Sequence, residues 1–114
     1  MTSGIFFIEF SVGPKNLGAG LAVISDGDIN GGDETYLYRG RLDAYGSQAK
    51  ATIEVGHYRG ALNSVFGPLR NFTLDLAGTI EEQAFDVQGT IKGTSSPMIR
   101  ISGRKVAQLY ERGA

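Results

Sequence analysis

The sequence predicts an all-β fold, a small up-and-down barrel of about seven to eight antiparallel strands. Apolar and polar residues alternate along most of the chain, as in strands that bury one face. The alternating segments recur every ~8–12 residues, which is typical of a meander that closes into a barrel or folds into a sandwich. Glycines inside the strand patterns favour the barrel, because they permit tight bends. The length suits one domain, residues 1–114.

Four strands are expected in the first half of the chain, over residues 5–12, 17–24, 35–42 and 49–58. Asp26-Gly27 supplies the positive φ angles of a two-residue hairpin turn, so a short strand is expected from Asp28 onward. The positions predicted to face inward are Phe6, Ile8, Phe10, Val12, Tyr36, Tyr38, Gly40, Leu42, Ala49, Ala51, Ile53, Val55 and His57.

In the second half, residues 60–69 break the alternation and predict a connection or at most one short helix. Residues 75–80 recur as residues 86–91, about one strand and one turn later, with Glu81-Glu82 as a solvated turn between them. The last segment, 104–113, fits a helix or an edge strand equally well. The inward positions of this half are Phe72, Leu74, Leu76, Phe85, Val87, Ile91, Ile99 and Ile101.

Composition narrows the function classes. A formal net charge of −1 argues against nucleic acid or an anionic membrane as partner. The absence of cysteine excludes disulfides, thiol catalysis and thiolate metal sites. The N-terminus has no basic leader, and no apolar run approaches the ~20 residues that cross a bilayer. We therefore expect a cytoplasmic protein.

Two motifs resemble known sites without completing them. Residues 26–31 match the first half of a calcium loop, but its twelfth position is Leu37 instead of glutamate, so no metal site is expected. Gly31-Gly32-Asp33-Glu34 resembles a diguanylate cyclase signature, but the chain lacks that domain's length and alternating helices. Gly31-Gly32 is predicted instead to form a turn or bulge with positive φ.

No catalytic set can be assembled, so we expect neither an enzyme nor a cofactor. His57 is the only histidine, and no orienting carboxylate or set of metal ligands lies near it in the sequence. It is expected to pack or to form a buried hydrogen bond, with a ligand contact through Ser64 or Asp75 as the alternative.

Two further groups of residues are candidates for binding. Tyr36, Tyr38, His57 and Phe10 are candidates to line a cavity for a small apolar ligand, although side chains fill many barrels of this size. The outward apolar residues Ile5, Phe7 and Leu37 are candidates for an interface between two copies of the chain.

The glycine and aromatic spacing resembles the GrlR family of small bacterial proteins, negative regulators of type III secretion and related sequences. The likeness rests on Gly4-Ile5-Phe6, Gly18-Ala19-Gly20, Gly31-Gly32-Asp33 and residues 36–40, followed by a long alternating strand. The resemblance implies a lipocalin-like β-barrel that dimerises and binds a protein partner without catalysis.

One departure from the family concerns charge. The secretion regulator of that family carries an acidic Glu-Asp-Glu-Asp run after the strand that corresponds to residues 36–42. This chain has residues 43–47 there, Asp-Ala-Tyr-Gly-Ser, with a single carboxylate. We therefore expect a regulatory or adaptor homodimer that has lost the charge complementarity of that loop. A small-molecule or lipid-binding barrel is the alternative.

Overall fold

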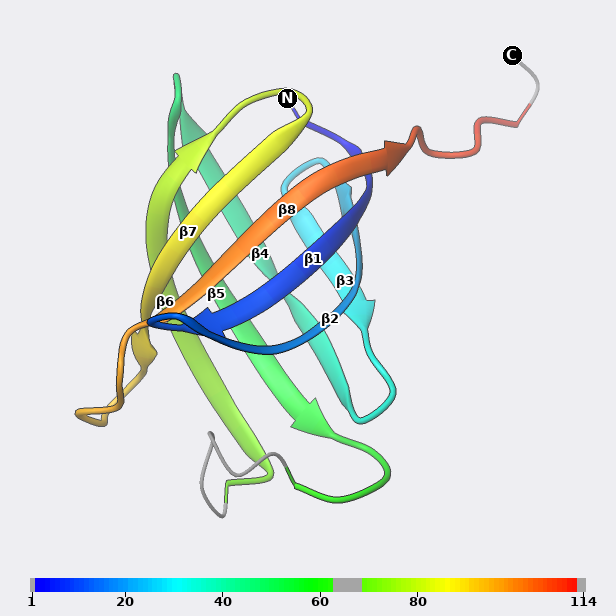
Figure 1. Cartoon of the computed structure of the whole chain (residues 1–114). Coiled ribbons are helices and arrows are strands. Elements are labelled where there is room, and N and C mark those ends of the chain that lie inside the picture. The colour runs from blue at the N-terminus through cyan, green and yellow to red at the C-terminus, as the bar shows by residue number, and fades with distance from the viewer. Residues whose placement is uncertain (1, 63–68, 113–114) are drawn as a thin grey trace.

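The chain forms eight β-strands and, within the described residues, no helix (Figure 1). The computed structural model describes residues 2–62 and 69–112. None of these residues belongs to a helix long and apolar enough to cross a membrane. The strands are β1 (Gly4–Val12), β2 (Lys15–Ser25), β3 (Asp28–Gly32), β4 (Tyr36–Tyr45), β5 (Gln48–His57), β6 (Asn71–Ile80), β7 (Ala84–Ile91) and β8 (Ile99–Ala107).

Each strand pairs antiparallel with the next one in the sequence, and β8 pairs with β1 to close a barrel. Each connection in the series from β1 to β5, and the connection from β6 to β7, is only a few residues long. Strands that are consecutive in the sequence therefore lie next to each other in the barrel. The all-β, up-and-down barrel predicted from the alternation is confirmed, and the sandwich alternative is excluded.

The interior is filled by the face that the alternation selects. Phe6 is fully buried, and its ring lies 5.4 Å from the Phe85 ring across the core. Val12, Gly40, His57 and Phe85 were expected inward but are only partly buried. Val12 and His57 each end their strand at the same open end of the barrel. The buried apolar residues are Phe6, Ile8, Phe10, Ala22, Ile24, Ile29, Tyr36, Tyr38, Leu42, Ala49, Ala51, Ile53, Val55, Phe72, Leu74, Leu76, Ile80, Val87, Ile91, Ile99 and Ile101.

The predicted hairpin turn at Asp26-Gly27 is confirmed. Their φ angles are 50° and 84°, and Ser25 pairs with Asp28 across the turn. Positive φ at both central residues is typical of a type I′ turn, whose backbone twist matches that of the two strands it joins.

Gly31 and Gly32 do not form the expected turn or bulge with positive φ. Both lie in β3 without positive φ, and Gly31 pairs with Ala22 and Tyr38. A Cβ added at Gly31 would lie 2.2 Å from the carbonyl oxygen of Leu21. Close approach of the neighbouring backbone, and not backbone conformation, therefore requires glycine here.

The two echoed segments form the β6–β7 hairpin and pair with each other. Leu76 of the first lies opposite Gly89 of the second, and Gly78 lies opposite Val87. A Cβ at Gly89 would lie 1.8 Å from the Asp75 carbonyl oxygen, and one at Gly78 would lie 2.0 Å from that of Asp86. Each glycine thus lets the partner strand approach beside a large inward residue.

The first part of the C-terminal segment belongs to the last strand of the barrel, and the rest extends beyond the barrel. β8 runs to Ala107, which pairs with Ile5, so residues 104–107 are strand. Residues 108–112 form neither the helix nor the strand that the sequence left open. In the connection expected over residues 60–69, positions 60–62 and 69 form no helix, and positions 63–68 lie outside the described residues.

The two faces of the wall should differ sharply in their tolerance of truncation. Phe6→Ala removes a fully buried ring and should lower the free energy of unfolding by about 3–5 kcal/mol. Lys50→Ala, on the exposed face of β5, should stay within about 0.5 kcal/mol. Urea denaturation followed by circular dichroism measures both, and equal losses would contradict the assigned faces.

Glycines that face close backbone should not accept alanine. Gly89→Ala places its Cβ against the Asp75 carbonyl and should destabilise the protein by about 3 kcal/mol. The control is Gly56→Ala, whose Cβ would meet only the movable Asn71 side chain, at 3.1 Å, and should change stability by less than about 1 kcal/mol. Similar melting temperatures for the two variants would show that backbone proximity is not the constraint.

Candidate functional site

Side chains, and not an internal ligand space, occupy the centre of the barrel. The cavity there measures about 30 Å³ and its lining is almost wholly apolar. Such a volume holds roughly one water molecule. A small ligand therefore has no room in the centre without repacking the core.

A larger cavity of about 440 Å³ opens at one mouth of the barrel. The end of β1, the first half of β2 and the β3–β4 turn surround it. Of the four residues expected to line a ligand cavity, Phe10, Tyr36 and Tyr38 border this mouth and His57 does not. The described lining consists of Phe10, Leu17, Gly18, Ala19, Asp33, Glu34, Thr35, Tyr36, Tyr38, Val55, Ala61 and Leu74.

Asp33 organises the rim of this mouth cavity. Its Oδ1 accepts hydrogen bonds from the amides of Thr35 and Tyr36, both at 2.7 Å, and its Oδ2 accepts one from the Tyr38 hydroxyl. The Tyr58 hydroxyl donates to the Asp33 backbone carbonyl at 2.5 Å. One side chain thus fixes the β3–β4 turn, as an aspartate does in an Asx turn, and also anchors a tyrosine of the barrel interior.

Tyr38 acts as a permanent donor in this arrangement. Burial raises the pKa of the Tyr38 hydroxyl far above its usual range, and the hydrogen bond to Asp33 raises it further. The group therefore stays protonated over the accessible pH range. Its ring packs against Phe10 with centroids 5.1 Å apart.

His57 takes part in packing and hydrogen bonding at the end of β5. Its Nε2 lies 2.7 Å from the Gly60 carbonyl oxygen and donates to it, while Nδ1 accepts from Arg70 at 3.3 Å. Its ring meets Tyr36 edge-on at 5.5 Å. Asp75, one suggested partner, lies on the outer face of β6, and Ser64 lies outside the described residues. This geometry matches the hydrogen-bonding role expected from the sequence, although the hydrogen bonds lie at the open end of the barrel.

The three outward apolar residues belong to a continuous stripe on the outer wall. The strand registers place Phe7, Leu21, Gly32 and Leu37 side by side across β1 to β4. Ile5 and Val23 form a second pair in the adjoining row. We call this surface the outer stripe, defined by Ile5, Phe7, Leu21, Val23 and Leu37.

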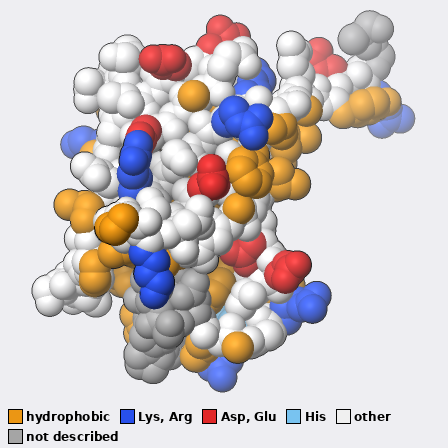
Figure 2. Space-filling model, viewed as in Figure 1, with side chains coloured by type: hydrophobic (Ala, Val, Ile, Leu, Met, Phe, Trp, Pro, Cys, Tyr) orange, Lys and Arg blue, Asp and Glu red, His pale blue; other side chains and the backbone are white. Residues whose placement is uncertain are grey.

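Three residues of the outer stripe, Leu21, Val23 and Leu37, are exposed, whereas Ile5 and Phe7 are half-buried. Leu21 is 51% exposed and Leu37 is 47% exposed, and the neighbouring Val106 of β8 is 49% exposed. Figure 2 shows hydrophobic side chains gathered over the start of β1 and the end of β8, at the right of the molecule. Leu21 and Val23 were missed in the sequence because the outward parity of residues 17–24 is visible only once their register with β1 is known.

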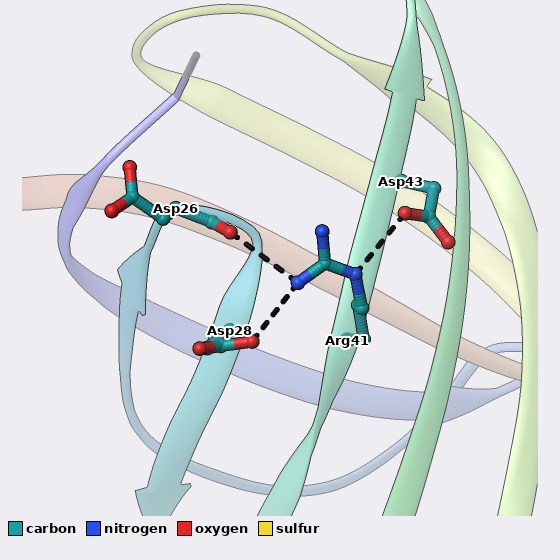
Figure 3. Close-up of polar contacts among 4 residues, drawn as sticks. All are labelled: Asp26, Asp28, Arg41 and Asp43. Atoms are coloured by element: carbon teal, nitrogen blue, oxygen red, sulfur yellow. Dashed lines mark hydrogen bonds and ion pairs between the residues drawn. The ribbon is translucent and has the colours of Figure 1, made fainter.

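The carboxylates near the β2–β3 and β4–β5 turns are engaged with an arginine (Figure 3). Arg41 contacts Asp28 Oδ1 at 3.1 Å through one terminal nitrogen and Asp43 Oδ1 at 3.4 Å through Nε. The same terminal nitrogen lies 3.4 Å from the Asp26 carbonyl oxygen. Arg41 thus places a positive charge beside part of the segment that resembles a calcium loop.

A second exposed ion pair joins β7 and β8. Nε of Arg100 donates to Asp86 Oδ1 at 2.8 Å, and a terminal nitrogen donates to Oδ2. These hydrogen bonds hold the pKa of the Asp86 carboxyl below its usual range. The stabilisation is therefore present at neutral pH and is lost as the pH falls through that lowered pKa.

The fold and these surfaces define a small closed β-barrel with a filled interior, an acidic mouth and an apolar outer stripe. The chain belongs to the GrlR family: the family described as "T3SS negative regulator, GrlR" matches residues 1–109. This confirms the resemblance found in the sequence. A comparison with curated proteins finds no match.

Removal of the Asp33 carboxylate should destabilise the mouth. Asp33→Ala leaves the Tyr38 hydroxyl and two turn amides without their acceptor, and should cost about 2–3 kcal/mol of unfolding free energy. Glu34→Ala, one residue further on, is the matched control and should change stability by less than about 0.5 kcal/mol. Chemical denaturation measures both, and an equal effect would refute the anchoring role of Asp33.

Proposed function

We propose that this protein is a non-catalytic regulatory or adaptor protein that acts as a homodimer and binds a protein partner. Membership of a family of negative regulators of type III secretion supports this proposal. The observation that carries the dimer is the outer stripe, because a contiguous apolar surface on a small barrel is typical of an interaction site.

The position of the stripe suits a twofold interface. The stripe crosses four neighbouring strands, so a second copy turned by 180° can lay the same surface against it. Gly32 lies between Leu21 and Leu37 and leaves a shallow place between two projecting side chains. The Arg104 guanidinium lies 5.6 Å from the centroid of the Phe7 ring and supplies a charged border.

The β4–β5 hairpin is a poor substitute for the acidic loop of the secretion regulator. The one carboxylate of residues 43–47, Asp43, is paired with Arg41, while Tyr45 near the tip is 70% exposed. A basic partner finds little unpaired negative charge there. We infer that recognition of a partner by this protein uses a different surface from that loop.

The mouth cavity favours a second candidate function, the binding of a small apolar ligand. Its volume of about 440 Å³ lies within the range of small-molecule sites, and Phe10, Leu17 and Leu74 give it an apolar floor. Native mass spectrometry of the purified protein, followed by the same measurement after denaturation, would reveal a retained ligand as a mass difference.

The dimer should depend on the outer stripe. Phe7→Glu places a carboxylate in the stripe and should convert a dimer into a folded monomer, since removing that charge from water is costly even beside the Arg104 guanidinium. Leu21→Glu should act in the same way, whereas Gln88→Glu, on the outer face of β7 beside Arg100, should remain dimeric. Light scattering at tens of micromolar gives the mass, and circular dichroism checks the fold.

A wild-type monomer in that measurement would overturn the dimer. Dissociation by Gln88→Glu as well as by Phe7→Glu would show that the stripe is not the interface.

A further inference from the structure

One strand of the barrel is paired on one side only over part of its length. β2 pairs with β1 from Lys15 to Ile24, but with β3 only from Leu21 to Ser25. β3 contains five residues against eleven in β2, so it ends before it can cover the first half of its neighbour. Within the described part of the chain, residues 15–19 therefore have no strand on their second side. We call this segment the open edge.

The space beside the open edge is accessible. A Cβ added at Gly18 would meet no atom within 4 Å, so the sheet face at this position is open, whereas one at Gly20 would meet the Gly32 carbonyl oxygen at 2.7 Å, where β3 ends. Lys15, Asn16, Gly18 and Ala19 are exposed. The segment has no proline, and its one charged side chain, Lys15, stands at its first position, so residues 16–19 present neither a proline nor a charge to a pairing strand.

The open edge also borders the mouth cavity. Leu17, Gly18 and Ala19 line one side of the cavity, and the β3–β4 turn lines the other. The register with β1 shifts at Phe10 and leaves Leu17 without a partner there, and its half-buried side chain joins the cavity lining. A strand laid along this edge alternates its side chains, so every second one would project toward the apolar floor.

We propose that the open edge docks an extended segment of a protein partner, which adds a strand beside β2 and carries basic residues next to apolar ones. The proposal rests on the proposed function, in that it supposes a protein partner. Backbone hydrogen bonds to the open edge would supply the affinity, and the mouth cavity would supply selectivity for the side chains.

The charge of the mouth indicates a basic segment. Asp33 and Glu34 lie on the rim, and no lysine or arginine is among the described residues that line the cavity; the one cation of the open edge, Lys15, stands at its first position, outside that lining. Asp33 already accepts three hydrogen bonds, whereas Glu34 is exposed and forms no ion pair within the described residues. A second copy paired edge to edge would bring its own two carboxylates to this rim, which disfavours self-association there.

The test is a titration of the isotope-labelled protein with a model peptide, a capped hexapeptide of alternating lysine and valine. We expect saturable shifts at residues 15–19 and slowed exchange of those amides in the segment that point away from β1; the Gly18 amide, which already donates to Asn16 Oδ1, is not among them. Two versions of the peptide, N-methylated at its odd or its even residues, separate strand pairing from general binding. One should bind normally and the other at least about tenfold more weakly, because only one edge of the peptide pairs with β2.

Charge is tested separately. A glutamate-valine peptide should bind at least about tenfold more weakly than the lysine-valine peptide. Glu34→Lys should weaken the lysine peptide to a similar degree, while Glu82→Lys, in the β6–β7 turn at the opposite end of the barrel, should leave it within about twofold.

Several outcomes would overturn the proposal. Equal binding of both N-methylated peptides, with shifts only inside the cavity, would indicate a site for small ligands. Shifts confined to the outer stripe, or no shifts at millimolar peptide, would place the docking surface elsewhere. Phe7→Glu distinguishes this proposal from the proposed dimer. If the variant is monomeric and still binds the peptide, the result supports docking at the open edge. If the protein is dimeric but does not bind the peptide, docking at the open edge is wrong and the dimer stands.

Discussion

The structure depends on one constraint: eight short strands must close around an interior narrow enough for their own side chains to fill. Closure requires the strands to coil, which brings neighbouring backbones close together on the inner face. Glycine occupies that face where the approach is tightest, as at Gly40, where a Cβ would lie 2.1 Å from the Thr52 carbonyl oxygen. At Gly103 the ring of Phe85, from the paired strand β7, occupies the space that a side chain would take. The same ring packs against Phe6.

Because the interior is full, binding is left to the mouth and the outer wall. The short β3 determines both surfaces. Where it pairs, Gly32 places no side chain between Leu21 and Leu37 on the outer wall. Beyond the end of β3, β2 pairs only with β1. The β3–β4 turn there is held by hydrogen bonds to the Asp33 carboxylate. A single short element thus gives the barrel an apolar flank and an acidic opening.

The proposed dimer interface and docking edge use separate surfaces of this member of a family of negative regulators. The outer stripe and the open edge lie on different parts of β2, so self-association and partner docking can operate independently. Some exposed charges on the rest of the wall are paired across strands, as in Arg41 with Asp28 and Arg100 with Asp86. Cross-strand pairs of this kind reinforce the register, and each contributes little to stability because it is exposed.

The sequence by itself determined the strands, the barrel and most of its core. Alternation depends only on neighbours two positions apart, so residues such as Phe6, Ile53 and Leu74 could be assigned inward from the chain alone. The tertiary structure decided everything that depends on register between strands. Leu21 lies beside Phe7 because of the register between β1 and β2. Glycine is required at position 31 because the backbone of Leu21 approaches closely, and not because a turn lies there. His57 is not among the residues that line the mouth cavity. Register is set by strands closing on one another, and that information is absent from any single segment of the sequence.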